Sequence, residues 1–131
     1  MRVIPRSIHV LFAVMALSGP TLARAGDPPP RTSASPRLLD LGSVHCIPCK
    51  AMAPILDRLR QDYAGQLTVE FIDVWKAKEE AERYRVNSIP TQIFYDALGR
   101  EVARHEGFIG RDDILATFTK AGVGLGSAKG R

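Results

Sequence analysis

The sequence contains only two cysteines among its 131 residues, Cys46 and Cys49, and they are separated by Ile47 and Pro48 alone. A disulfide stabilises a protein chiefly by closing a long loop of the unfolded chain, and a bridge across two residues closes almost none. The sequence therefore excludes a disulfide-stapled scaffold. So short a pair points to thiol chemistry rather than to stapling.

Histidine is also scarce, with three residues, and this bears on metal binding. A Cys-x-x-Cys pair can be half of a zinc site, but such a site needs four ligands, usually Cys and His. His9 lies in the N-terminal segment, His45 is crowded against Cys46, and His105 fits the polar face of a hairpin. We therefore expect no metal site and no other cofactor.

No apolar run reaches the roughly 20 residues that a membrane-spanning helix needs. The largely apolar stretch 8–17 follows two arginines, is interrupted at 18–20 by Ser-Gly-Pro, and precedes Ala-Arg-Ala at 23–25. This order is typical of a cleavable secretory signal peptide, which we assign to residues 1–25 in preference to a membrane anchor.

A basic stripe with interleaved aromatic residues is also missing. The formal net charge is +4, but three arginines belong to segment 1–25, and without them it falls to +1. We therefore expect no nucleic-acid partner.

The rest of the chain suits one globular domain. Residues 26–36 are rich in proline and small polar residues, which predicts a flexible tether. The domain itself is predicted at 37–123, and the glycine-containing segment 124–131 is predicted to be a disordered tail.

Apolar periodicity predicts strands at 37–42, 67–74, 91–95 and 100–106, and helices at 47–64, 76–85 and 111–121. This order predicts an α/β fold with a mixed four-stranded sheet, parallel in its first half, ending in an antiparallel hairpin and flanked by helices on both faces. We interpret Trp75, just after a strand, as a packing residue rather than a substrate platform.

The two cysteines stand where a predicted strand gives way to a predicted helix. Unpaired N–H groups and the positive end of the helix dipole would stabilise a thiolate on Cys46. We therefore assign Cys46 as the nucleophile. Cys49, one helical turn further on, is assigned as the resolving thiol.

Cys-x-Pro-Cys-Lys after a buried strand, with Ile89-Pro90-Thr91 opening a later strand, resembles the thioredoxin family over residues 37–123. The resemblance implies a thioredoxin-like fold, here without the N-terminal strand and helix of full thioredoxins. It also implies that Asp40, six residues before Cys46, accepts the proton of Cys49. The leucines around Asp40 favour burial over exposure on an edge strand, and burial raises a carboxyl pKa towards neutrality.

The same resemblance implies a cis peptide bond before Pro90, with the Ile89 backbone pairing with an extended substrate and Gly107 near the active-site surface. We add His45, Ile47 and Pro48, beside the cysteines, to the candidate substrate-binding residues. His45 and Ile47 replace the family's usual Trp and Gly, and a solvent-facing loop residue remains the alternative for His45. The family's lysine near the buried Asp has no counterpart in strand 67–74.

The sequence thus predicts a periplasmic, monomeric thiol-disulfide oxidoreductase that reduces disulfides of exported proteins. By the resemblance, its electron donor would be a membrane thiol-electron transporter of the kind used in cytochrome c maturation. Two alternatives stay open: an oxidase that donates its disulfide, and a non-catalytic module that binds extended peptides.

Overall fold

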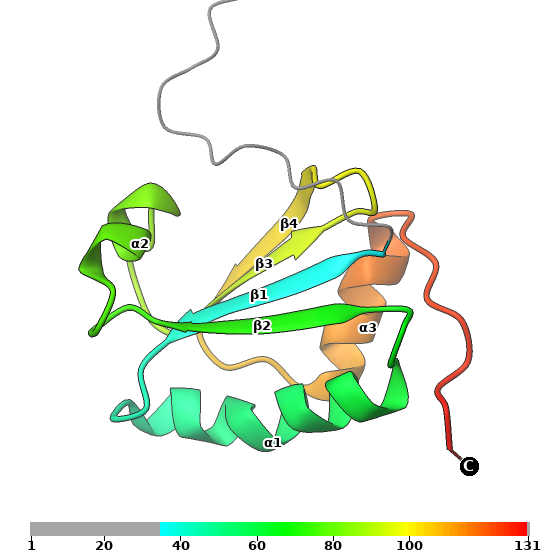
Figure 1. Ribbon diagram of the computed structural model, residues 1–131, viewed down its shortest axis with the longest axis horizontal. Helices are drawn as coiled ribbons and strands as arrows, with labels where there is room; N and C mark the ends of the chain where they lie inside the picture. The colour runs from blue at the N-terminus through cyan, green and yellow to red at the C-terminus, as the bar shows by residue number, and fades with distance from the viewer. Residues whose placement is uncertain (1–34, 131) are drawn as a thin grey trace, which may run out of the picture.

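The computed structural model describes residues 35–130, so the predicted signal peptide and nearly all of the predicted tether lie outside the described residues. Three helices and four strands follow one another in the predicted order (Figure 1). They are β1 (Arg37–Gly42), α1 (Ile47–Asp62), β2 (Thr68–Asp73), α2 (Lys78–Arg83), β3 (Thr91–Tyr95), β4 (Glu101–Glu106) and α3 (Arg111–Lys120).

The four strands form one sheet in the order β2-β1-β3-β4. β1 pairs parallel to β2 and antiparallel to β3, and β3 pairs antiparallel to β4. The predicted α/β fold with its mixed sheet is therefore confirmed. Within residues 35–130, no helix or strand precedes β1.

β1 lies between two apolar layers, and all six of its residues are buried. Successive side chains of a strand point to opposite faces. Leu38 accordingly packs in the layer that contains residues of α1 and α3, whereas Leu39 and Leu41 pack in the layer on the α2 side. Figure 1 shows the same arrangement, with α1 and α3 against one face of the sheet and α2 against the other.

The strand register gathers three chain segments at one edge of the sheet. Leu41, near the end of β1, pairs with Thr91 at the start of β3, and Thr91 pairs with Glu106 at the end of β4. Because only four residues separate the last paired residue of β1 from the start of α1, the first turn of α1 also lies at this edge (Figure 1).

Both α1 and α2 are shorter than the sequence predicts. α1 ends at Asp62 rather than at 64, because Tyr63 caps it and Gly65 takes the left-handed conformation (φ +82°) that commonly follows a helix. α2 covers only Lys78–Arg83 of the predicted 76–85, because the N–H groups of residues 76 and 77 donate instead to the Asp73 carbonyl in a turn after β2.

Residues 124–130 form no helix or strand, yet they contact the domain. Leu125 packs against the α1/α3 core layer, and the Lys129 N–H donates to the Asp62 carbonyl at 2.6 Å. The Gln66 side chain donates to the Ser127 carbonyl at 3.1 Å. These contacts differ from the disorder predicted for 124–131, because one apolar side chain anchors an otherwise small and polar segment.

Candidate active site

Cys46 and Cys49 form a disulfide at the N-terminal end of α1, with their Cα atoms 5.2 Å apart. Cys46 is the N-cap of α1, and its Sγ accepts a hydrogen bond from the Cys49 N–H at 3.4 Å. The first N–H groups of a helix have no partner within it and carry the positive end of its dipole. Cys46 is partly exposed whereas Cys49 is only 4% exposed, so a substrate reaches the outer sulfur first.

The turn from β1 into α1 is held by Ser43. Its carbonyl accepts a hydrogen bond from the Cys46 N–H, and its Oγ accepts one from the His45 N–H, each at 3.2 Å. The preceding Gly42 allows the helix to approach the sheet, since a Cβ there would lie 3.0 Å from Cys49 Sγ and 3.3 Å from the Phe71 ring. The role of Gly42 was not predicted, because a lone glycine at a strand end is no signal by itself.

The Ile89–Pro90 segment opens β3 at the same edge of the sheet. Its peptide bond is cis, as the family resemblance implied. The Pro90 carbonyl accepts a hydrogen bond from the Gly107 N–H at 2.7 Å, which ties the end of β4 to the start of β3. Pro90 is buried, while Ile89 and Gly107 are partly exposed. The structure therefore brings Ile89, Pro90 and Gly107 to the edge at which α1 begins.

Asp40 lies in the middle of β1 with no exposed surface, as the leucines around it predicted. Its Oδ1 accepts a hydrogen bond from Gln92 Nε2 at 2.7 Å. Asp40 Oδ2 and Gln92 Oε1 are buried and have no hydrogen-bond partner within the described part of the chain. Asp40 and Gly42 lie two residues apart on the same strand, so Asp40 faces the side on which Gly42 meets Cys49.

Burial raises the pKa of Asp40 to about 6, because desolvation disfavours the charged form. The hydrogen bond from Gln92 and the positive charge of Arg60 lower this pKa, but less than burial raises it. The Arg60 guanidinium, on α1, donates hydrogen bonds to the Val69 carbonyl of β2 and to Asp57 of α1. Neither Gln92 nor Arg60 was predicted to act on Asp40, because both do so only through the tertiary structure.

Apolar side chains are exposed around the disulfide. Ile47 is 82% exposed, and Trp75 is 56% exposed rather than packed, so the interpretation of Trp75 as a packing residue is wrong. Trp75 stacks on His45, with ring centroids 6.0 Å apart and ring planes at 18°. It is exposed because it lies in the turn that follows the end of β2. Five large apolar side chains at this end are exposed: Val44, Ile47, Phe71, Trp75 and Phe108.

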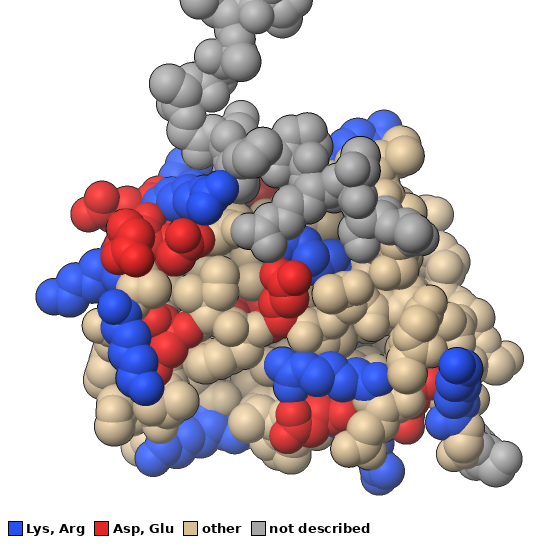
Figure 2. Space-filling view, in the orientation of Figure 1, with Lys and Arg blue, Asp and Glu red and all other residues tan. Residues whose placement is uncertain are grey.

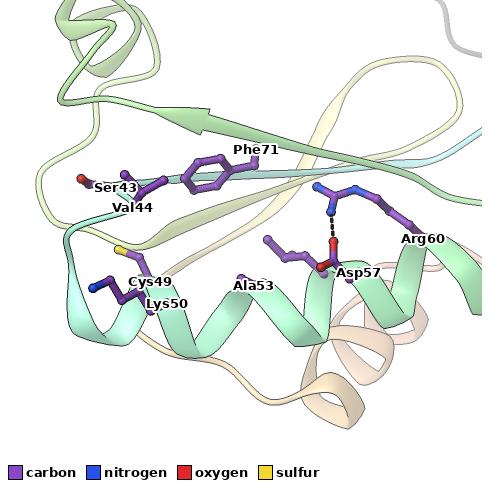
Figure 3. A pocket seen from close by; sticks show the side chains of 9 residues that line it. Ser43, Val44, Cys49, Lys50, Ala53, Asp57, Arg60 and Phe71 are labelled. Carbon is purple, nitrogen blue, oxygen red and sulfur yellow. Dashed lines mark hydrogen bonds and ion pairs between the residues drawn. The ribbon is translucent and has the colours of Figure 1, made fainter.

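A cavity of about 310 Å³ lies between β2 and α1 and reaches the inner cysteine (Figure 3). Val44, Ala53 and Phe71 give it apolar walls, and Cys49 lines the same cavity. In Figure 3 the Phe71 ring projects from β2 over α1. Arg60 and Asp57 form an ion pair at the end of the cavity that lies away from Cys49. The inner sulfur is therefore covered from the surface but borders an apolar cavity.

The remaining chemistry of residues 35–130 is limited. They contain no group of three or more His, Cys, Asp or Glu side chains placed to hold a metal ion. Over the same range, no helix has the length and apolar character needed to span a membrane. On the face seen in Figure 2, basic and acidic side chains are interspersed, so this face presents no single-sign patch.

A Cys-x-x-Cys disulfide at a helix N-terminus, beside a cis-proline that opens a β-strand, defines a thiol-disulfide exchange protein of the thioredoxin-like class. The thioredoxin family model matches residues 31–120. The chain belongs to the thioredoxin family, and it is a thioredoxin-type thiol-disulfide oxidoreductase with Cys46 and Cys49 as its redox-active pair.

Several known proteins are similar to this chain. Thioredoxin C-2 of Corynebacterium nephridii is 33% identical over 82 residues, which cover 63% of this chain and 75% of that protein. A thioredoxin of Staphylococcus aureus is 33% identical over 84 residues, covering 64% and 80%. Among solved structures, the germline-specific thioredoxin Deadhead of Drosophila melanogaster superposes with a TM-score of 0.59 at 30% identity, covering 68% and 83%.

Asp40→Asn should stabilise the oxidised protein increasingly as the pH rises. Below about pH 4 the Asp40 carboxyl is protonated in both the folded and the unfolded chain, because its ordinary pKa is 3.8. Between about pH 4 and the folded pKa of about 6, Asp40 is protonated in the folded chain and ionised in the unfolded chain. The unfolding free energy of wild type therefore falls as the pH rises through this range. From pH 4 to pH 7 the variant should gain about 2–3 kcal/mol over wild type in denaturant titrations.

Leu98→Ala is the control, because Leu98 is exposed in the turn between β3 and β4 and carries no titratable group. Its difference in unfolding free energy from wild type should stay flat over the same pH range. An Asp40→Asn difference that is equally flat would contradict the raised pKa.

Proposed function

We propose that the chain reduces disulfide bonds of exported proteins in the periplasm, with Cys46 as the nucleophile and Cys49 as the resolving thiol. The observation that carries the proposal is the unequal setting of the two sulfurs. Cys46 is partly exposed at the N-cap of α1, and Cys49 is buried one turn further on.

The reaction has two exchange steps. In the first, the Cys46 thiolate attacks one sulfur of a substrate disulfide, a Cys46–substrate disulfide forms, and the other substrate sulfur leaves as a thiolate. In the second, the Cys49 thiolate attacks Cys46 Sγ, which releases the second substrate thiolate and forms the Cys46–Cys49 disulfide. The substrate gains two electrons, and a reductant must then return the pair to its dithiol form.

Asp40 acts in the second step as the acceptor of the Cys49 proton. With a pKa of about 6, Asp40 is mostly ionised at neutral pH and can accept a proton. This pKa is also close enough to neutral pH for Asp40 to release the proton again. Its place on the face of β1 that meets Cys49, through Gly42, supports this role. The proton moves from the Cys49 thiol to the Asp40 carboxylate as the Cys49 sulfur becomes the nucleophile.

The substrate is an extended polypeptide with apolar side chains beside its cysteine. The partly exposed Ile89, directly before the cis-proline, offers backbone groups for pairing with such a peptide. The exposed side chains around the disulfide would pack against it. The residues assigned to substrate binding are His45, Ile47, Pro48, Ile89, Pro90 and Gly107.

Two features of the sequence favour reduction of substrates over oxidation. One is Pro48, directly before the second cysteine, and the other is the segment Ile89-Pro90-Thr91. A reducing enzyme outside the cytoplasm needs electrons from across the membrane, so the proposed donor is a membrane thiol-electron transporter. The protein would act as a monomer. The rivals are an oxidase that donates its disulfide and a non-catalytic peptide-binding module, and each predicts a different result below.

Cys46→Ser and Cys49→Ser should each abolish catalysed reduction of insulin disulfides, because each removes one of the two exchange steps. Cys49→Ser should also accumulate a mixed disulfide with substrate, visible on a non-reducing gel, whereas Cys46→Ser should not. Leu98→Ala is the control, since Leu98 is exposed in the hairpin turn between β3 and β4. If both cysteine variants reduced insulin as fast as wild type, the reduction would not depend on Cys46 and Cys49, and the proposed exchange mechanism would be wrong.

The reduction potential of the Cys46–Cys49 pair should lie nearer to about −270 mV, typical of thioredoxin, than to about −120 mV, typical of a strong periplasmic oxidant. Equilibration with a glutathione series, followed by alkylation and mass measurement, gives the value. A potential near −120 mV would replace the reductase with the oxidase.

Expression of the full 131-residue chain in a bacterium with a periplasm should yield a periplasmic protein that begins at Gly26, because cleavage after Ala-Arg-Ala removes 25 residues. Fractionation followed by intact-mass analysis measures both points. An uncleaved chain confined to the cytoplasm would contradict the proposed location and leave the chemistry of the cysteines untouched.

A further inference from the structure

Gln92 is a buried polar side chain that the exchange chemistry described above does not use. It has no exposed surface and lies on β3, where the strand register places it directly opposite Asp40. Its Nε2 donates to Asp40 Oδ1 at 2.7 Å. Its Oε1 has no partner within residues 35–130, and the same is true of Asp40 Oδ2. Burying Gln92 Oε1 and Asp40 Oδ2 without hydrogen-bond partners lowers the stability of the fold, which suggests that the two side chains have a function.

The surroundings of Asp40 leave Gln92 as its principal polar neighbour. On the other side of β1, Phe71 of β2 occupies the opposite register position and offers no hydrogen bond. From α1, the charge of Arg60 acts on Asp40, but the Arg60 guanidinium donates its hydrogen bonds to the Val69 carbonyl and to Asp57. The inner thiol residue, Cys49, meets β1 at Gly42. Lys50 and Asp57 of α1 line the same cavity as Cys49 and Arg60.

An amide differs from a cationic side chain in the protonation states it can serve. A lysine or arginine can only donate hydrogen bonds, so it suits an ionised carboxylate but cannot accept the O–H of a protonated one. A glutamine carries both a donor and an acceptor on the same group. When Asp40 is ionised, Nε2 donates to it, and when Asp40 is protonated, the free Oε1 can accept the carboxyl proton.

We propose that Gln92 is a positioning residue of the redox reaction, whose amide hydrogen-bonds Asp40 in both of its protonation states while Asp40 exchanges a proton with Cys49. The inference rests on the proposed role of Asp40. The proton leaves Cys49 Sγ as the thiolate forms and resides on the Asp40 carboxyl, with Gln92 Oε1 as its acceptor. It later leaves Asp40 for solvent, and Gln92 Nε2 again faces the carboxylate.

The test is the pH dependence of the second exchange step. Reduced protein is mixed with dithiobis(nitrobenzoic acid), and the attack of Cys49 on the Cys46 mixed disulfide is followed as release of the second coloured thiolate. In wild type this rate should fall as Asp40 is protonated. We call the pH range of this fall the acid limb of the rate profile. In Gln92→Leu the ionised Asp40 loses its hydrogen-bond donor, so its pKa rises and the acid limb should move up by roughly one pH unit.

Ile93→Val is the matched control, because Ile93 is the next residue of β3 and packs in the α2-side layer, away from Asp40. It should leave the limb in place. In an Asp40→Asn background, Gln92→Leu should produce no further change in the profile. A Gln92→Leu limb at the wild-type pH, or a rate lowered equally at every pH, would overturn the proposal for Gln92 alone. An Asp40→Asn profile identical to wild type would overturn the role of Asp40 as well.

A measurement on the unaltered protein covers the case in which Gln92→Leu does not fold. The side-chain amide NMR signals of Gln92 should titrate with the same midpoint as the Asp40 carboxyl carbon, because Gln92 Oε1 accepts a hydrogen bond from Asp40 only when the carboxyl is protonated. Amide signals that stay constant through the titration of Asp40 would overturn the proposal.

Discussion

The Sγ of Cys46 accepts a hydrogen bond from the Cys49 N–H at the first turn of α1, and the rest of the site is arranged around this cap. A helix begins with N–H groups that have no partner inside it, and here a sulfur takes the place of the usual Ser or Asp oxygen. The cap requires that α1 start at one fixed point beyond β1. The Ser43 turn sets that point, and Gly42 allows the helix to press its inner sulfur against the sheet.

The buried carboxylate of Asp40 is the second constraint, and it works against stability. A charged group without exposed surface loses its hydration, and one hydrogen bond from Gln92 with a nearby Arg60 offsets only part of that loss. An apolar side chain would fill this position in the sheet at lower cost. Retaining an acid here is understandable when its proton takes part in the chemistry of Cys49, since functional sites often reduce stability.

The sequence predicted those parts of the molecule that depend on local patterns. The apolar run of β1, the spacing of Cys46 and Cys49, and the periodicity of α1 all act between near neighbours in the chain, and the structure has these elements where they were expected. The exposure of Trp75 was missed, because an aromatic residue after a strand reads the same whether the next turn faces inward or outward. The partnership of Asp40 with Gln92 spans 52 positions and depends on strand register, which no local pattern encodes.

The account depends most directly on the ionisation of Cys46 at the helix N-terminus. In reduced Cys49→Ser, Cys46 is the only thiol, so the pH dependence of its alkylation by iodoacetamide gives its pKa without coupling to a second cysteine. The account predicts a pKa at least about one unit below the value of roughly 8.5 for free cysteine. A pKa at or above that of free cysteine would mean that the end of α1 does not stabilise the thiolate, and the central claim would be contradicted.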